Sequence, residues 1–324
     1  MDAKVSEVLL RLNRGSRRMQ HDAFRPWAFK QLSDIVAFDS AFWYRWAIEA
    51  RHSPLHASYL YLQPQRLLDE YFAGELWNDD VVYLRALASP PGTAIYETRL
   101  NYASERMKDF MLRHQQEHLL TIAYWDVISM VAAGISLYRN ASSCPFDAQE
   151  ARLVEVVAPH FIDAWRENWL MDVIRQSSSR ADLPEFSLGV MVNGGLLSEA
   201  QDNFGAMMRD EWPAWQGPRP PNDLLDHFAK QTTPWIGTSV AIYRRVLADG
   251  TVLLLVRRVH PLDQLAPRKR SVAVMVAHGA SQSEIARRLS LSPSTVNNYL
   301  TDVYEHLEVH DRVMLANLVM SLEP

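Results

Sequence analysis

The sequence predicts an α+β protein in which two sections of strands and helices precede an all-helical end. In the first half, apolar and aromatic runs of strand length are separated by segments with helical periodicity. The central stretch contains two apolar runs joined by Asp249-Gly250, a dipeptide typical of tight hairpin turns. Residues 265–324 contain four short segments with helical spacing and with residues that favour helix ends.

Length and composition indicate several packed domains. The chain has 324 residues, of which 48% are hydrophobic and 22% charged, an ordinary globular composition. This length predicts two or three domains. The stretch 176–180 carries no apolar side chain and is followed by Pro184, so we place a boundary there. The predicted domains are 1–176, 184–262 and 265–324.

Charge and cysteine content exclude several classes of protein. A formal net charge of -5 excludes a protein that coats nucleic acid with its whole surface, so any nucleic-acid binding must be local. The single cysteine, Cys144, excludes an intramolecular disulfide and a multi-cysteine metal site. The first residues resemble neither a signal peptide nor a membrane span. We therefore expect a cytoplasmic protein without a membrane partner.

The first section is predicted to consist of strands bracketed by helices. Val5, Val8, Leu9 and Leu12 have the spacing of an amphipathic helix. Its apolar stripe must be buried on another part of the chain or on a second copy. Further elements follow from apolar runs and periodicity: strands over 38–46, 57–62, 119–125 and 128–138, and helices over 67–76 and 148–174.

The middle section is predicted to contain two hairpins around a helix. The first hairpin is expected over 188–197, and the second over 242–259 with Asp249-Gly250 at its turn. The proline-rich stretch 212–221 is predicted to be a loop.

The last section carries the clearest helix signals. Ser281 and Glu284 have the spacing of a capping box, and Ser292 is followed by Pro293, which is favoured at a first helical position. Asp311 is placed to cap a fourth helix. A short helix, a tight turn and a longer helix are therefore predicted between 281 and 307.

The longer helix has two different faces. Val296, Leu300, Val303 and Leu307 define a stripe that should be buried. Hydroxyl and amide side chains lie roughly opposite, together with one carboxylate: Ser294, Asn297, Asn298, Thr301 and Glu305. A helix with such a face fits the major groove of DNA, where asparagine can bond adenine and hydroxyls can bond phosphate.

These residues resemble the LuxR-type helix-turn-helix over about sixty residues. The resemblance rests on Pro267-Arg268, Gly279-Ala280-Ser281, residues 284–289, residues 291–296 and Leu307-Glu308-Val309. It implies a dimer that binds double-stranded DNA, with the third helix in the major groove and the fourth often helping dimerisation.

The resemblance also implies roles for single residues. Asn297, Asn298 and Thr301 fall at base-reading positions. The predicted contacts with the DNA backbone are Ser281, Arg288, Ser292, Ser294 and Thr295.

Several positions depart from the family pattern. Asn297 replaces the usual lysine, and Glu305 and His306 stand where basic residues are usual. Because residues 265–324 are formally neutral, we expect fewer phosphate contacts. Ala266 replaces a capping Ser or Thr, and Glu308 replaces a glycine. Both changes are expected to reduce stability without changing the fold.

The earlier sections carry less specific resemblances. Residues 134–139, Pro145-Phe146-Asp147 and the long helix that follows resemble a GAF-type sensor domain, which implies a central antiparallel sheet with helices. The middle section resembles a PAS-like α/β fragment. A sensor cavity is expected to be lined by aromatic residues, or these form the core: Trp43, Trp46, Tyr59, Tyr61, Phe72, Trp77, Tyr83 and Trp125.

One pattern suggests catalysis. Residues 114–118 read His-Gln-Gln-Glu-His, the spacing of some zinc peptidases. No third carboxylate ligand on a later helix is evident, so we interpret this segment as a solvated turn before the strand at 119. We expect no catalytic residue, no metal and no cofactor.

The main hypothesis is a sequence-specific transcription regulator whose N-terminal region senses a small molecule or a partner. The alternatives are a ligand-independent dimeric regulator, with that region as an assembly platform, and a metalloenzyme with an appended DNA-binding domain. Expected partners are double-stranded DNA, a second copy of the chain, RNA polymerase and an unidentified small-molecule effector.

Overall fold

The computed structural model describes residues 3–47, 55–126, 131–176, 186–192, 195–201, 203–248 and 250–322. The predicted linker at 177–180 and Pro184 lie outside these residues, as does Asp249. The described residues form two compact units, one built on 3–176 and one holding most of the remainder. Within the described ranges, no helix is both long and apolar enough to cross a membrane.

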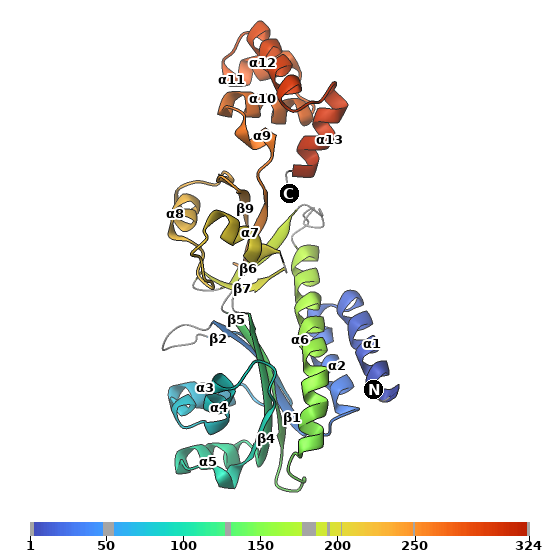
Figure 1. Ribbon diagram of the computed structural model, residues 1–324, viewed down its shortest axis with the longest axis vertical. Coiled ribbons are helices and arrows are strands. Elements are labelled where there is room, and N and C mark those ends of the chain that lie inside the picture. The colour runs from blue at the N-terminus through green and yellow to red at the C-terminus, as the bar shows by residue number, and fades with distance from the viewer. Residues whose placement is uncertain are drawn as a thin grey trace. The chain divides into compact units, whose positions relative to one another are not determined.

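The first unit is built on a five-stranded antiparallel sheet with the order β2-β1-β5-β4-β3 (Figure 1). Its strands are β1 (Ser40–Ala47), β2 (Leu55–Tyr61), β3 (Ile95–Thr98), β4 (His118–Asp126) and β5 (Val131–Arg139). All four strands expected from the sequence are present, and β3 is an additional short edge strand.

One face of this sheet is covered by three helices (Figure 1). These are α1 (Ala3–Arg18), α2 (His21–Ser33) and the long α6 (Ala148–Gln176). The predicted stripe of α1 is buried, and α1 packs on α6 of the same chain. The partner that the sequence left open for this helix is therefore supplied within the chain.

The opposite face carries shorter helices, and we refer to it as the α3–α5 face (Figure 1). It is covered by α3 (Arg66–Ala73), α4 (Val81–Ala88) and α5 (Glu105–Arg113), with single turns η1 (Leu76–Asn78) and η2 (Arg99–Asn101) between them. Both faces of the sheet are thus covered by helices. Successive side chains of β1 enter different cores: Trp43 packs on the face covered by α1, α2 and α6, and Tyr44 packs on the α3–α5 face.

The second sheet has the order β7-β6-β10-β9-β8, which is the same order when strands are numbered within each sheet. Its strands are β6 (Ser187–Val192), β7 (Leu196–Ala200), β8 (Trp235–Ile236), β9 (Val240–Val246) and β10 (Val252–Arg258), accompanied by α7 (Phe204–Glu211) and α8 (Asn222–Lys230). The strands of both predicted hairpins are hydrogen-bonded neighbours, β6 with β7 and β9 with β10. Residues 193–194 of the first turn lie outside the described residues, and Gly250 has a φ of 85° at the second turn. The short β8 and the second helix were not predicted.

The helical end contains α9 (Pro261–Gln264), α10 (Pro267–Ala277), α11 (Gln282–Leu289), α12 (Pro293–His306) and α13 (Arg312–Leu322). The last four are the four helices expected from the sequence. They enclose one apolar core whose fully buried members include Val272, Ile285, Val296, Val303 and Leu315. The α+β class, the antiparallel sheets and the all-helical end are therefore confirmed.

Candidate DNA-binding surface and sensor region

The first helix of the helix-turn-helix, α11, begins at the predicted capping box. The Ser281 hydroxyl accepts a hydrogen bond from the Glu284 backbone N–H, and Glu284 Oε2 accepts from the Ser281 backbone N–H at 2.8 Å. The bonds from the Ser281 backbone and side chain lower the pKa of Glu284. Ser281 therefore fixes the start of α11 and remains exposed there.

A tight turn joins α11 to α12. Ser290 adopts a left-handed φ of 54°, and the Leu291 N–H bonds the Ala286 carbonyl at 2.9 Å. Ser292 then caps α12 by accepting from the Thr295 N–H at 3.1 Å, and its hydroxyl lies 2.8 Å from that of Ser294. Three residues predicted to contact the DNA backbone thus gather at the start of α12, where free backbone N–H groups favour an anion.

The two faces of α12 are those that the sequence predicts. Val296, Leu300, Val303 and Leu307 are buried. The polar set Ser294, Asn297, Asn298, Thr301 and Glu305 is exposed. A 14-residue helix with amides and hydroxyls along its exposed side therefore follows a capped tight turn.

A side chain of α11 joins this polar edge. The Gln282 Nε2 donates to Asn297 Oδ1 at 3.3 Å, so the two amides lie side by side across the turn. The Thr301 hydroxyl is bonded to the Asn297 carbonyl at 3.2 Å. Sequence reasoning missed Gln282, although its place as first residue of α11, next to the capping serine, was a usable signal.

Half of the basic residues after 265 are used within the domain. Lys269 pairs with Asp302 at 2.7 Å, Arg270 with Asp263 at 3.3 Å, and Arg312 donates to the Ala280 carbonyl at 2.8 Å. The exposed basic residues that make none of these bonds are Arg268, Arg287 and Arg288. The predicted shortage of phosphate contacts is therefore stronger than the formal charge suggests.

Residues 263–319 match the family model described as bacterial regulatory proteins, luxR family. These residues form a LuxR-type helix-turn-helix domain. The chain is 37% identical over 71 residues to the nitrate/nitrite response regulator protein homolog of Haemophilus influenzae, which is 21% of this chain and 34% of that protein. The chain thus covers about a third of that relative's length.

Two solved structures show a weaker likeness. Escherichia coli SdiA has 11% identity and a TM-score of 0.41, with 97% of this chain and 95% of SdiA covered. The phycoerythrobilin-bound GAF domain of a cyanobacterial phytochrome has 8% identity and a TM-score of 0.37, covering 52% of this chain and 98% of that domain. TM-scores below 0.5 do not establish a shared fold.

The LuxR-type domain keeps its fold despite the two unusual helix ends. Ala266 precedes α10 without a side-chain capping bond. Glu308 has a φ of 53°, the left-handed conformation that glycine adopts without strain. The Val309 N–H still bonds the Tyr304 carbonyl at 3.1 Å, which closes the end of α12.

The aromatic residues predicted to line one sensor cavity lie in separate places. The ring of Trp43 stacks on that of Trp165 with centroids 4.7 Å apart, and the rings of Tyr59 and Tyr61 stack on that of Phe29. These residues lie in the core between the first sheet and helices α1, α2 and α6. The three predicted residues therefore belong to the core rather than to a cavity wall. Because alternate side chains of a strand enter opposite faces, Trp46 lies on the other face of the sheet from Trp43.

The other five predicted residues lie away from that core. Trp46 lies near Tyr83, with ring centroids 6.3 Å apart, and Trp125 packs on the same cluster as Trp46. Phe72 and Trp77 form a separate pair, with ring centroids 5.9 Å apart. The eight aromatic residues therefore do not surround a single space.

A buried polar cluster occupies the α3–α5 face. Asp80 caps α4 by accepting from the N–H groups of Val82 and Tyr83, and its carboxylate also accepts from the hydroxyls of Tyr71 at 3.0 Å and Tyr102 at 3.4 Å. Burial raises the pKa of Asp80 despite these bonds. Sequence reasoning missed Asp80, whose position before a helical apolar run signalled a cap.

The His-Gln-Gln-Glu-His segment forms the predicted turn before the strand, but both of its histidines are buried, so the prediction that this turn is solvated is wrong. His114 Nε2 lies 2.9 Å from Glu70 Oε2. His118 belongs to β4, and its Nδ1 lies 3.0 Å from Thr98 Oγ1. Among the described residues, no group of three or more His, Cys, Asp or Glu side chains is placed to hold a metal.

Proposed function

We propose that this chain is a sequence-specific, DNA-binding transcription regulator that acts as a homodimer. The observation that carries this proposal is the exposed amide and hydroxyl edge of α12 within a LuxR-type domain. In this role Asn297, Asn298 and Thr301 contact base edges, while Ser292, Ser294 and Thr295 contact the backbone at the helix start. Ser281, which caps α11, and Arg288 on α11 add backbone contacts.

The apolar end of α13 supports dimerisation. Val313 is 68% exposed and Met314 43% exposed, and both lie at the start of that helix. A second copy of the helix would cover these side chains, as the LuxR resemblance implies. RNA polymerase is a further proposed partner, and the proposed location is the cytoplasm.

The experiment that tests DNA recognition is selection of bound sites from a random duplex pool by the full chain. We expect one enriched sequence built from two half-sites. Replacing Asn297 and Asn298 with alanine should weaken the enrichment, whereas Asn317→Ala, an exposed amide on α13, should leave it unchanged. If the alanine variants at Asn297 and Asn298 enrich the site as strongly as Asn317→Ala does, α12 is not the helix that reads the bases.

We further propose that the N-terminal unit senses a small molecule or a partner through its α3–α5 face. The indole Nε1 of Trp46 is buried without a hydrogen-bond partner among the described atoms, and Tyr83 lies beside it. Buried polar groups are usually bonded, so this N–H is a candidate donor to an effector.

Thermal unfolding with candidate effectors tests the sensing function. A ligand at a hundred times its dissociation constant should stabilise the chain by about 2.7 kcal/mol, and Trp46→Phe should reduce that gain. The packed aromatic residues of the α6 side instead favour the second candidate, a ligand-independent regulator whose N-terminal unit is an assembly platform. Absence of any stabilisation across a broad set of metabolites would favour that candidate.

The metalloenzyme alternative loses its support, because His114 and His118 are bonded to separate partners. We therefore propose a regulator and not an enzyme.

A further inference from the structure

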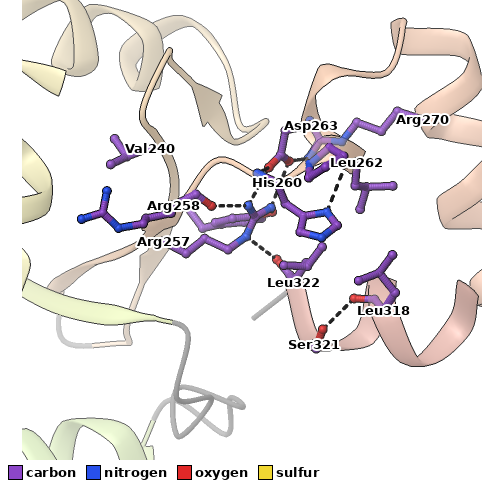
Figure 2. A network of polar contacts seen from close by, with 12 residues as sticks. Val240, Arg257, Arg258, His260, Leu262, Asp263, Arg270, Leu318, Ser321 and Leu322 are labelled. Carbon is purple, nitrogen blue, oxygen red and sulfur yellow. Dashed lines mark hydrogen bonds and ion pairs between the residues drawn. The ribbon is translucent and has the colours of Figure 1, made fainter. Parts of the chain in front are cut away.

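Arg257 is a charged side chain buried at the end of β10. Its side chain is 1% exposed, and that of its partner Asp263 is fully buried. Nη1 and Nη2 of Arg257 donate to the two carboxylate oxygens of Asp263 at 2.6 and 3.0 Å. Figure 2 shows this pair between the second sheet and the helices of the LuxR-type domain.

The remaining donors of Arg257 bond three other groups. Nε donates to the Leu322 carbonyl at 3.0 Å and Nη1 to the Arg258 carbonyl at 3.0 Å (Figure 2). Nη2 donates to the Tyr243 hydroxyl at 2.7 Å. A guanidinium has five N–H donors, and all five are used here. The bonds therefore join β9 and β10 of the sheet to α9 and to the last residue of α13.

Asp263 extends the connection to α10. Its carboxylate also accepts from the His260 N–H at 2.9 Å and lies 3.3 Å from the guanidinium of Arg270. Burial alone would raise the pKa of Asp263, but the bonds from Arg257 and from the His260 N–H outweigh burial and lower it. The carboxylate is therefore held in its charged form.

This arrangement strongly favours one orientation of the LuxR-type domain on the sheet. If the domain rotated away, Arg257 or Asp263 would be left as an unpaired buried charge, which is strongly unfavourable. An apolar contact between the same elements would tolerate sliding, because apolar burial has no direction. A guanidinium with every donor bonded does not tolerate sliding, because its hydrogen bonds depend on direction.

We propose that Arg257 is a positioning residue that fixes the LuxR-type domain to the second sheet, so that the sheet and the DNA-binding helices move as one rigid body. A signal from the sensor region would then act on DNA by moving this body as a whole. The DNA-binding part of this inference rests on the proposed function, but the rigid connection does not.

Distances between two spin labels in the full chain test the connection without DNA. Cys144 is the only cysteine and is exposed, so Cys144→Ser allows labels at Val246→Cys on β9 and Glu305→Cys on α12. Dilution with unlabelled chain restricts the signal to distances within one chain. The parent should give one narrow distance distribution, and Arg257→Met should give a broad one.

Companion variants separate positioning from stability. Arg258→Gln, at an exposed neighbour that pairs with Asp210, is the matched control and should keep the narrow distribution. The double variant Arg257→Met with Asp263→Leu replaces the buried pair by apolar groups and should unfold near the parent temperature, yet stay broad. A narrow distribution in this double variant, or a broad one in the parent, would overturn the proposal.

A DNA measurement then connects the rigid body to function. The parent should prefer one spacing between paired half-sites, and the double variant should lose at least about tenfold of that preference, since paired binding depends strongly on geometry. Affinity for a single half-site should stay the same. If no duplex binds while the labels behave as expected, the proposed function fails and the rigid connection stands.

Discussion

The outer edge of α12 and the α3–α5 face of the first sheet both gather polar side chains, but they hold them in opposite environments. On α12 the amides and hydroxyls are exposed above a buried apolar stripe. On the α3–α5 face Asp80 is buried and bonded to tyrosine hydroxyls and backbone N–H groups. The first set is available to a partner, whereas the second is required by the fold.

This difference has a consequence for mutations. Removing an exposed amide should change what the chain binds and leave its stability within about 0.5 kcal/mol. Removing a buried carboxylate should change stability first, because its former partners lose their hydrogen bonds in the interior of the protein.

The largest effect is expected for Asp80→Ala. This change removes the cap of α4 and leaves the hydroxyls of Tyr71 and Tyr102 without that acceptor, so it should destabilise the first unit by about 3 kcal/mol. Chemical denaturation measures the loss. Asp80→Asn keeps a capping oxygen and should lose clearly less. Equal stability of the alanine variant and the parent would contradict the role given to this carboxylate.

The raised pKa of Asp80 adds a pH dependence. Burial favours the protonated form in the folded state, so the carboxyl binds its proton more tightly there than in the unfolded chain. Relative to Asp80→Asn, the parent should gain stability as pH falls through the raised pKa, down to the ordinary value near 3.8. Denaturation of both proteins at several pH values tests this sign, and a loss on acidification would contradict it.

The next effect concerns the α12 edge. Asn297→Ala and Asn298→Ala should each reduce discrimination between the selected site and a changed base pair by about 1 to 3 kcal/mol, with no loss of stability. Titration of labelled duplexes measures it. Because Gln282 bonds Asn297, Gln282→Ala should add little to the Asn297 variant. If the losses of discrimination in the two single variants add up in the double variant, Gln282 and Asn297 act independently.

The sequence could predict the α12 edge because one helix has one buried face, and a 3.6-residue period assigns Val296 and Asn297 to different environments. The same reasoning failed for the aromatic residues of β1 and β2. Their sheet is covered on both faces, so alternation separates Trp43 from Trp46 without saying which side is core. Asp80, Gln282 and Arg257 each have a partner far away in the sequence, respectively Tyr102, Asn297 and Leu322, and only the folded chain brings these pairs together.

A smaller effect is expected at the end of α12. Glu308→Gly removes a non-glycine residue from a φ of 53° and should stabilise the LuxR-type domain by about 1 kcal/mol. Thermal unfolding should show the gain, and target preference should not change. A destabilised variant would mean that the Glu308 side chain makes a contact that outweighs the strain.

The smallest effect concerns phosphate contacts. If Arg288 contacts phosphate, Arg288→Ala should lower the slope of log affinity against log salt by about 0.9, a difference of roughly threefold between 50 and 200 mM. The loss should be equal for selected and unrelated duplexes. A loss of affinity confined to the selected duplex would indicate that Arg288 contacts a base and not the DNA backbone.

Binding of duplex DNA by the folded, full-length chain at low ionic strength tests the central claim most directly. We predict that a labelled pool of duplexes is bound at about 50 mM salt, and that replacing Asn297, Asn298 and Thr301 with alanine abolishes sequence preference while retaining weaker general binding. A chain that is folded by circular dichroism and leaves every duplex unbound under these conditions would contradict the assignment of α12 to the major groove.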